Sequence, residues 1–173
     1  MPDIAHSAQD YYDRLNSLAE ASGPTFFQLS AQLPKQGRTN IPLAATNVMS
    51  VVLKTYASEG ENALHAHVNE DHVFLILQGR AEFYGPEGQT WRAGLHEGVL
   101  LPRGTFYSFR AISDEPLVMV RIGSAVDTAE DVTARIHPDG HAMAGDSAEN
   151  KEVPLILHET RWFGPNGASQ APA

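Results

Sequence analysis

The chain has 173 residues, of which 42% are hydrophobic and 19% are charged, and this length and composition predict one compact globular domain. Twelve basic against 21 acidic residues give a formal net charge of −9, which lacks the basic footprint of a protein that binds nucleic acid or an anionic membrane surface. The chain has no cysteine. Disulfides, thiolate zinc sites, iron–sulfur clusters and cysteine nucleophiles are therefore excluded, and a metal ion would need His, carboxylate or Tyr ligands.

Residues 1–24 predict an N-terminal helical segment. Ser7 and Asp10 have the spacing of a capping box, apolar residues recur at helical spacing over 11–19, and the Gly-Pro pair at 23–24 ends the pattern. The opening residues show neither the basic region nor the apolar stretch of a secretion signal. The longest apolar run in the middle of the chain, Val73–Leu77, is far shorter than the roughly 20 residues that span a bilayer. We expect a cytoplasmic protein without a membrane helix.

Residues 25–123 predict an antiparallel sandwich or barrel, because short runs of β-branched and aromatic residues alternate there with turn residues. The Gly-Pro-Glu-Gly stretch at 85–88 predicts a hairpin turn. Residues 124–173 form a C-terminal extension: a polar segment with a turn at 138–140, an apolar run at 153–157, and a Gly-, Ala-, Pro- and Ser-rich tail that we expect to be disordered. The expected strands are Phe26–Ser30, Asn47–Tyr56, Val73–Gln78, Ala81–Tyr84, Gln89–Ala93, Gly98–Leu101, Phe106–Ala111 and Leu117–Ile122.

Three of the eight histidines, His65, His67 and His72, lie within eight residues. Alternate side chains of an extended segment share a face, so His65 and His67 can reach one metal ion. His72 opens an apolar strand that we interpret as buried on both faces, where an imidazole needs a partner. The alternative for each is a structural, hydrogen-bonded histidine. That is how we interpret His6, His137, His141 and His158, with His96 at the surface.

Two segments carry a resemblance to a known family. GENALHAHVNEDHVFLILQG (60–79) resembles the first motif of the cupins, in which Gly, His-x-His, Glu and Gly follow one another on two strands. HEGVLLPRGTFYSF (96–109) resembles the second, Pro-x-Gly followed by the last ligand. Two motifs in the right order are more specific than either alone. The resemblance covers roughly residues 47–122 and implies an all-β fold, a single cupin jelly-roll barrel with a metal in its interior.

The resemblance also implies a ligand set. His72 stands where the family has Glu, and Tyr107 stands where the family has its last His. Glu70 and Asp71 lie close to the Glu position. We prefer His72, because Gly79 sets the count and a shift of one residue turns a side chain to the other face. The implied metal ligands are His65, His67, His72 and Tyr107.

Three neutral imidazoles leave a divalent transition metal its full charge, which favours an anionic, oxygen-bearing ligand. Imidazole suits several such ions. We place Fe(II) first, with Ni, Zn or Mn as alternatives. Tyr107 has two open roles: a phenolate ligand, or a catalytic hydrogen-bond donor or general acid/base beside an open coordination position.

We expect a metal-dependent enzyme that acts on a small organic anion, with a dioxygenase favoured. A non-redox lyase or isomerase that uses Tyr107 as acid/base is the first alternative. A non-catalytic small-molecule-binding cupin is the second, because one fold hosts many unrelated activities. The expected partners are a small-molecule substrate and a second copy of the chain in a homodimer, and neither nucleic acid nor a membrane. The helix and the C-terminal extension are expected to cover sheet edges or one end of the barrel.

Overall fold

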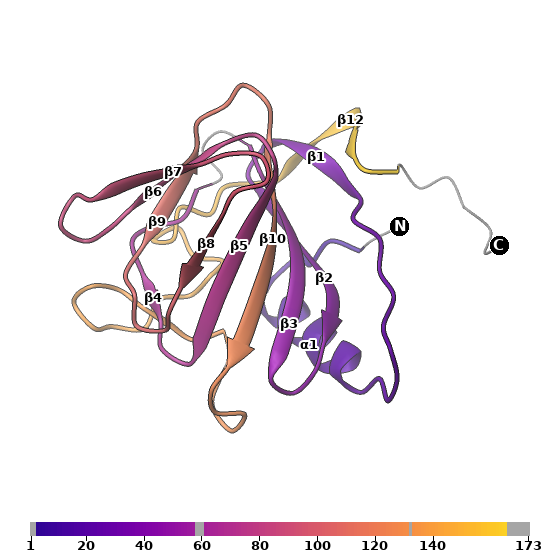
Figure 1. Cartoon of the computed structure of the whole chain (residues 1–173), viewed down its shortest axis with the longest axis vertical. Coiled ribbons are helices and arrows are strands. Elements are labelled where there is room, and N and C mark those ends of the chain that lie inside the picture. Colours follow the sequence, from indigo (N-terminus) through magenta and orange to yellow (C-terminus); the bar gives the residue numbers. More distant parts are fainter. Residues whose placement is uncertain (1–2, 58–60, 132, 166–173) are drawn as a thin grey trace.

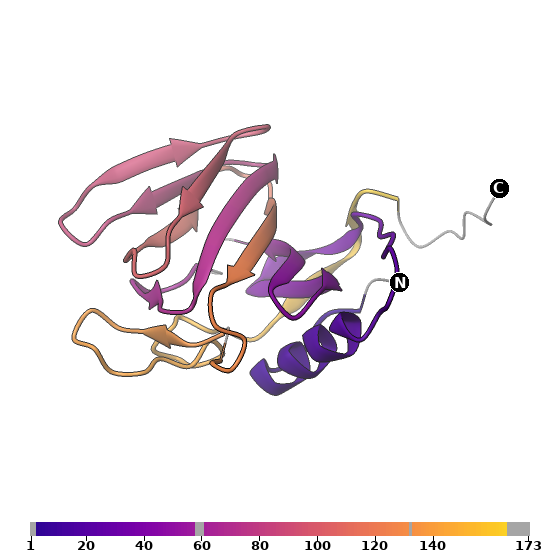
Figure 2. The same cartoon turned by 60° about the horizontal axis from the view of Figure 1, so that its bottom comes forward.

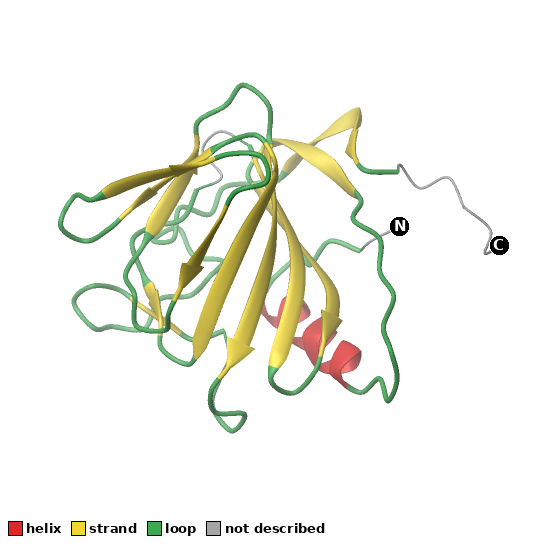
Figure 3. Ribbon diagram, in the orientation of Figure 1, coloured by secondary structure: helices red, strands yellow, loops and turns green. Residues whose placement is uncertain are grey.

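The computed structural model describes residues 3–57, 61–131 and 133–165, and these consist mostly of strands with one helix (Figures 1 and 3). The all-β class expected from the sequence is confirmed. The expected disordered tail falls mainly outside the described residues. The elements are α1 (Ala8–Ala19), β1 (Ala31–Gln36), β2 (Arg38–Ala45), β3 (Met49–Tyr56), β4 (Ala66–His67), β5 (Glu70–Gln78), β6 (Ala81–Tyr84), β7 (Thr90–Ala93), β8 (Gly98–Leu101), β9 (Ser108–Ala111), β10 (Leu117–Ala125), β11 (Arg135–Ile136) and β12 (Ile156–Phe163).

Two antiparallel sheets enclose the main core. The larger has the strand order β2-β3-β10-β5-β8 and the smaller the order β7-β6-β9. Phe74 and Met119 from the larger sheet pack with Phe83 and Phe109 from the smaller one, and the strands of the two sheets fan apart from one end (Figure 1). In the described residues no ladder hydrogen bonds join the two sheets. The arrangement is a jelly roll whose interior is filled by aromatic and aliphatic side chains.

The outer face of the larger sheet has a core of its own. Because side chains alternate along a strand, Leu117 and Met119 of β10 face the interior while Val118 and Val120 face outward. The two-stranded sheet of β1 and β12 contributes the side chains that cover them, Leu33 among these. The first strand of the chain and the last described one thus close this face together.

Helix α1 begins where the sequence predicts. Ser7 is the N-cap, with extended backbone and a side chain that accepts a hydrogen bond from the Asp10 N–H at 3.1 Å. Such a cap satisfies one of the donors that a helix start leaves open. Leu15 is the buried side chain of the helix. Figure 2 shows α1 and the segment around β11 below the two sheets, at the same end of the molecule.

The described residues contain no helix with the length and apolar character that crossing a bilayer requires.

Five strands, β1, β2, β4, β11 and β12, lie outside the expected set, and two further expectations differ from the structure. Residues 26–30 form no strand, and Phe26 is 93% exposed, because an apolar run without a partner gains nothing from being extended. Strands β1 and β2 contain Pro34 and Pro42, and proline is a poor strand residue. Proline is tolerated at edges and irregularities: β2 is an edge strand, and both ladders shift register at the proline. Strand β5 is not buried on both faces, because Leu75 is 43% exposed.

Candidate metal centre and its cavity

The two sequence motifs meet at a short antiparallel bridge. The His65 N–H donates to the Tyr107 carbonyl at 3.1 Å, and the Tyr107 N–H donates to the His65 carbonyl at 3.0 Å. The Gly104 N–H, in the Pro-x-Gly turn, donates to the His67 carbonyl at 2.7 Å. Backbone hydrogen bonds therefore hold the His-x-His segment against the segment that carries Tyr107.

The four residues expected as ligands are brought together in the interior, where each is at most 6% exposed. His65 Nε2 lies 3.3 Å from His67 Nε2. The rings of His67 and His72 lie 4.1 Å apart between centroids. Tyr107 Oη lies 3.5 Å from His72 Nδ1. The proximity agrees with the expectation, while ligation by these four side chains stays a prediction.

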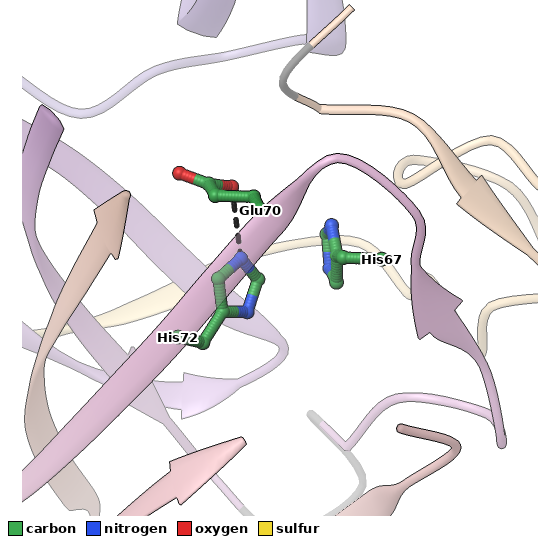
Figure 4. Close-up of side chains that lie close together, drawn as sticks. All are labelled: His67, Glu70 and His72. Carbon is green, nitrogen blue, oxygen red and sulfur yellow. Dashed lines mark hydrogen bonds and ion pairs between the residues drawn. The ribbon is translucent and has the colours of Figure 1, made fainter. Parts of the chain in front are cut away.

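Glu70 is a site residue that the sequence reasoning passed over. It lies two residues before His72 on β5, so both side chains point to the same face. Glu70 Oε2 lies 2.8 Å from His72 Nε2 (Figure 4). Donor atoms of His67, Glu70 and His72 all lie within 4.8 Å of one another. The objection that a shift turns a side chain away applies to Asp71, and the even spacing from His72 could have identified Glu70.

Room for the Glu70 carboxylate comes from the neighbouring strand. Gly123 of β10 pairs with His72, and a Cβ at Gly123 would overlap the Glu70 carboxylate. The carboxylate pairs with Arg121, also on β10, and accepts from Ser50 Oγ at 3.3 Å. Burial alone would raise the pKa of Glu70, but the Arg121 guanidinium and the hydrogen bonds of His72 and Ser50 hold it below its ordinary value of 4.5.

Arg121 is the second residue that the sequence reasoning missed. It interrupts the apolar run of β10 and is 5% exposed. Besides Glu70 it reaches the Tyr11 hydroxyl of α1 at 3.0 Å, and its Nη2 lies 2.6 Å from His72 Nε2. His72 Nε2 can donate to Glu70 or accept from Arg121, and one tautomer cannot do both. A single charge inside an apolar strand was the available signal, because such a charge is rarely buried without a partner.

The buried imidazoles are neutral. Burial lowers the pKa of His65 from 6.5 to about 3 and that of His72 to about 4, and it places the pKa of His67 well below the ordinary value. His65 Nδ1 lies 2.8 Å from the Ala63 carbonyl, which fixes the proton there and leaves Nε2 with its lone pair. His67 Nδ1 is buried without a hydrogen-bond partner among the described residues. Neutral imidazoles with free lone pairs fit a transition metal ion.

A cavity of about 140 Å³ adjoins this group, and His65, His67 and Tyr107 line it. Burial raises the pKa of Tyr107 to about 12, so its phenol is protonated at neutral pH. Residues from the start of α1 and from the C-terminal extension also line the cavity, so both segments close this end of the jelly roll. Four cationic side chains belong to the cavity wall: Arg38, Lys54, Arg121 and Arg135.

Of the remaining histidines, His6 belongs to the cavity wall, whereas His96, His137, His141 and His158 do not. His96 is exposed and has a positive φ of 68°, in agreement with the surface position expected for it. His137 and His141 flank a turn at Gly140 and form, with Asp139, a second group whose donor atoms lie within 4.8 Å of one another. That group lies largely at the surface, and His141 is hydrogen-bonded to Asp139 and Glu149.

Comparison with solved structures supports the fold. The cupin domain of Schizosaccharomyces pombe Cnp3 matches with a TM-score of 0.50 and 21% identity over 57% of this chain and 71% of that one. KdgF from Halomonas sp. matches with a TM-score of 0.51 and 17% identity over 61% and 98%. The conserved protein SPY1581 of unknown function from Streptococcus pyogenes matches with a TM-score of 0.50 and 15% identity over 62% and 99%. Identities this low speak for the fold alone.

The sequence itself carries a family match. The model of the cupin domain matches residues 52–123, from within β3 to within β10, and the match includes the clustered histidines and Tyr107. No curated protein matches the chain. Both sequence motifs, the jelly roll and the family match agree that residues 52–123 form a cupin domain.

Proposed function

We propose that this cupin holds a divalent transition metal at its buried histidines and acts on a small organic anion in the adjoining cavity. The observation that carries the proposal is the position of His67. Its side chain belongs to the group of donor atoms within 4.8 Å and also to the cavity wall. An ion held there would face the space where a small molecule can bind.

His67 and His72 are common to both candidate ligand sets, the one implied by the cupin motifs and the one formed with Glu70. We propose His65 as the third ligand and Glu70 as the group that orients His72. The Glu70 carboxylate is already paired with Arg121 and Ser50. A carboxylate on one ring nitrogen fixes the tautomer of a metal-binding histidine and raises its basicity. His72 Nδ1, on the side of Tyr107, is then left for the ion.

A Glu70→Gln variant separates the two sets. If Glu70 orients His72, the amide can still hydrogen-bond to the ring, and we expect stoichiometric metal with an affinity lowered by about 10- to 100-fold. If Glu70 is itself a ligand, we expect Glu70→Gln to lose stoichiometric metal binding and His65→Ala to retain it. Isothermal titration with Mn²⁺, Ni²⁺ and Zn²⁺ measures both variants against the parent protein.

For the reaction we propose two classes, each with its own support. Three neutral imidazoles leave an ion with open positions, the arrangement that a dioxygenase requires. The Tyr107 hydroxyl, 3.5 Å from His72 Nδ1, supports instead a lyase or isomerase in which the phenol moves a proton. In either class a bound divalent ion supplies Lewis acidity to the substrate oxygen, and the cations of the cavity wall stabilise negative charge that develops on it.

Turnover assays on metal-loaded protein distinguish these activities. A dioxygenase consumes O2 with Fe(II) and is silent under nitrogen, whereas a lyase or isomerase converts its substrate anaerobically with several divalent ions. His67→Ala is the inactive control, and His96→Ala, at an exposed position, is the matched active control. Ligand-induced thermal stabilisation without turnover would instead identify a binding protein.

A further inference from the structure

Two of the four cations in the cavity wall have acidic partners. Arg121 pairs with Glu70, and Arg38 pairs with Glu152. Within the described residues, Lys54 and Arg135 form no ion pair with a carboxylate. The acidic side chains that line the cavity are Asp146 and Glu152. Glu152 is paired with Arg38, and Asp146 accepts from the Ala8 N–H at 2.9 Å and forms no ion pair with Lys54 or Arg135 among the described residues.

Lys54 and Arg135 reach the cavity wall from two different strands. Lys54 lies on β3, between strands β2 and β10 of the larger sheet, and its Nζ is 5.8 Å from the centre of the Tyr56 ring. Arg135 lies on β11, where it pairs in register with His67. Both line the cavity that His65 and His67 also line. A molecule next to the histidines is therefore within the same cavity as both cations.

The surroundings hold Arg135 in place without neutralising it. Its Nε is buried with no hydrogen-bond partner among the described residues. Its guanidinium packs against Gly145, where an added Cβ would overlap Nη1. A buried donor left without a partner carries a desolvation cost, and here it adjoins a cavity that can hold an acceptor.

The protonated form of Lys54 is equally unfavourable without an anion. Burial lowers its pKa well below 10.5, and the nearby charges of Arg121, Arg135 and Arg38 lower it further. Positive groups in a low-dielectric wall raise the local concentration of anions. The electrostatics of the wall therefore favour a negatively charged ligand over an empty or neutral one.

Size and charge together define the ligand. About 140 Å³ is close to the roughly 150 Å³ of a cavity that holds benzene, a molecule of six carbon atoms. A monoanion on a divalent ion would leave Lys54 and Arg135 uncompensated. Resting on the proposed function, we infer that Lys54 and Arg135 bind a second anionic group, so that the substrate is a small organic dianion such as a three- or four-carbon dicarboxylate.

Matched probes test this inference. Malonate and succinate, phosphonoacetate as a dianion with a phosphonate end, and the monoanions propionate and butyrate are titrated into metal-loaded and metal-free protein by calorimetry. We expect at least tenfold tighter binding of a dianion than of the monoanion of the same chain length. Preference for malonate or succinate over phosphonoacetate identifies the second group as a carboxylate, and the reverse preference identifies it as a phosphoryl group. Equal affinity for monoanions and dianions would overturn the inference.

Variants assign the preference to the two cations. Lys54→Met and Arg135→Met should each lose at least tenfold in dianion affinity, with little change for the monoanion and unchanged metal content. Gly145→Ala should weaken dianion binding by displacing the guanidinium while keeping its charge. Lys35→Met, at an exposed position of β1, is the control. Because Lys54→Met removes an uncompensated cation, we expect the ligand-free variant to fold and to melt no lower than the parent. Unchanged dianion affinity in folded variants would contradict the inference.

The two proposals fail separately. Protein that takes up no metal yet binds dianions through Lys54 and Arg135 would refute the metal-dependent function and leave the cation pair as assigned. Protein that takes up metal through His67 but binds monoanions and dianions equally would refute the cation pair alone.

Discussion

Glu70 and Arg121 form an ion pair whose side chains are 3% and 6% exposed. The pair joins β5 to β10 directly beside His72. Two charges taken out of water are costly unless each satisfies the other. The pair therefore connects the stability of the larger sheet with the orientation of the candidate metal centre.

Arg121→Met should destabilise the protein by about 3–5 kcal/mol, because it leaves the Glu70 carboxylate buried and unpaired. Adding Glu70→Gln to Arg121→Met should recover a large part of that loss. Urea denaturation of the parent, both single variants and the double variant measures the coupling. Arg14→Met breaks the more exposed pair of Arg14 with Asp10 and should cost no more than about 1 kcal/mol. Strictly additive losses at Glu70 and Arg121 would contradict the account.

Phe74 packs at the centre of the aromatic side chains of the interior. It is 2% exposed, and its ring lies 5.8 Å from that of Phe109 and 6.0 Å from that of Tyr107. Phe74→Ala should cost about 3–5 kcal/mol of unfolding free energy, because the cavity it leaves cannot collapse between two sheets. Leu100→Ala, at a side chain that is 62% exposed, should change it by no more than about 0.5 kcal/mol. Similar losses in the two variants would place the core elsewhere.

Glu82 makes stability depend on acid pH. It lies at the centre of the smaller sheet, in register with Arg92 and Arg110, and hydrogen bonds from Tyr84, Arg92 and Arg110 lower its pKa from 4.5 to about 2. A pKa that is lower in the folded state stabilises the protein above pH 4.5, and this contribution disappears as the pH falls toward 2.

Glu82→Gln should therefore be less stable than the parent at pH 7, and the difference should shrink between pH 4.5 and pH 2. Thermal melts across that range measure it. Glu87→Gln, at an exposed turn position, should show a pH profile parallel to that of the parent. A Glu82→Gln deficit that persists undiminished at pH 2 would exclude the carboxylate as its source.

Tyr107→Phe tests whether the phenol is a ligand. The histidines alone already bring several nitrogen donors together, and the Tyr107 hydroxyl lies beside His72. We expect the variant to keep its metal and to lose turnover by about 100- to 10,000-fold if the phenol moves a proton. Loss of stoichiometric metal, or loss of a phenolate-to-iron absorption band present in the parent, would show that the phenol is a ligand.

The cupin fold could be predicted largely because its signals are local. Gly79, with a φ of 75°, ends β5 where the motif places a glycine, since only glycine adopts that conformation freely. The turn at 85–88 joins β6 and β7 as expected. Strands β1 and β2 were not predicted, and each contains a proline. A sheet accepts proline at its edges and irregularities, and the sequence alone does not show which strands lie there.

The site was predictable to the extent that its residues lie close together in sequence. The spacing of His65, His67 and His72 indicates a metal site in the sequence alone. Arg121 and Arg135 reach the same interior from β10 and from the C-terminal extension, and no local pattern relates them to the histidines. The cavity wall is therefore cationic although the chain as a whole has a net charge of −9, and this difference arises only on folding.

The metal content of the protein decides whether the buried histidines form a metal centre. Elemental mass spectrometry is applied to untagged parent protein, to His67→Ala and His72→Ala, and to two controls, His96→Ala and the double variant His137→Ala/His141→Ala. The account predicts about one equivalent of a transition metal in the parent and in both controls, and its loss in His67→Ala and His72→Ala. A full equivalent retained in His67→Ala and His72→Ala, or metal lost only from the His137/His141 variant, would contradict it.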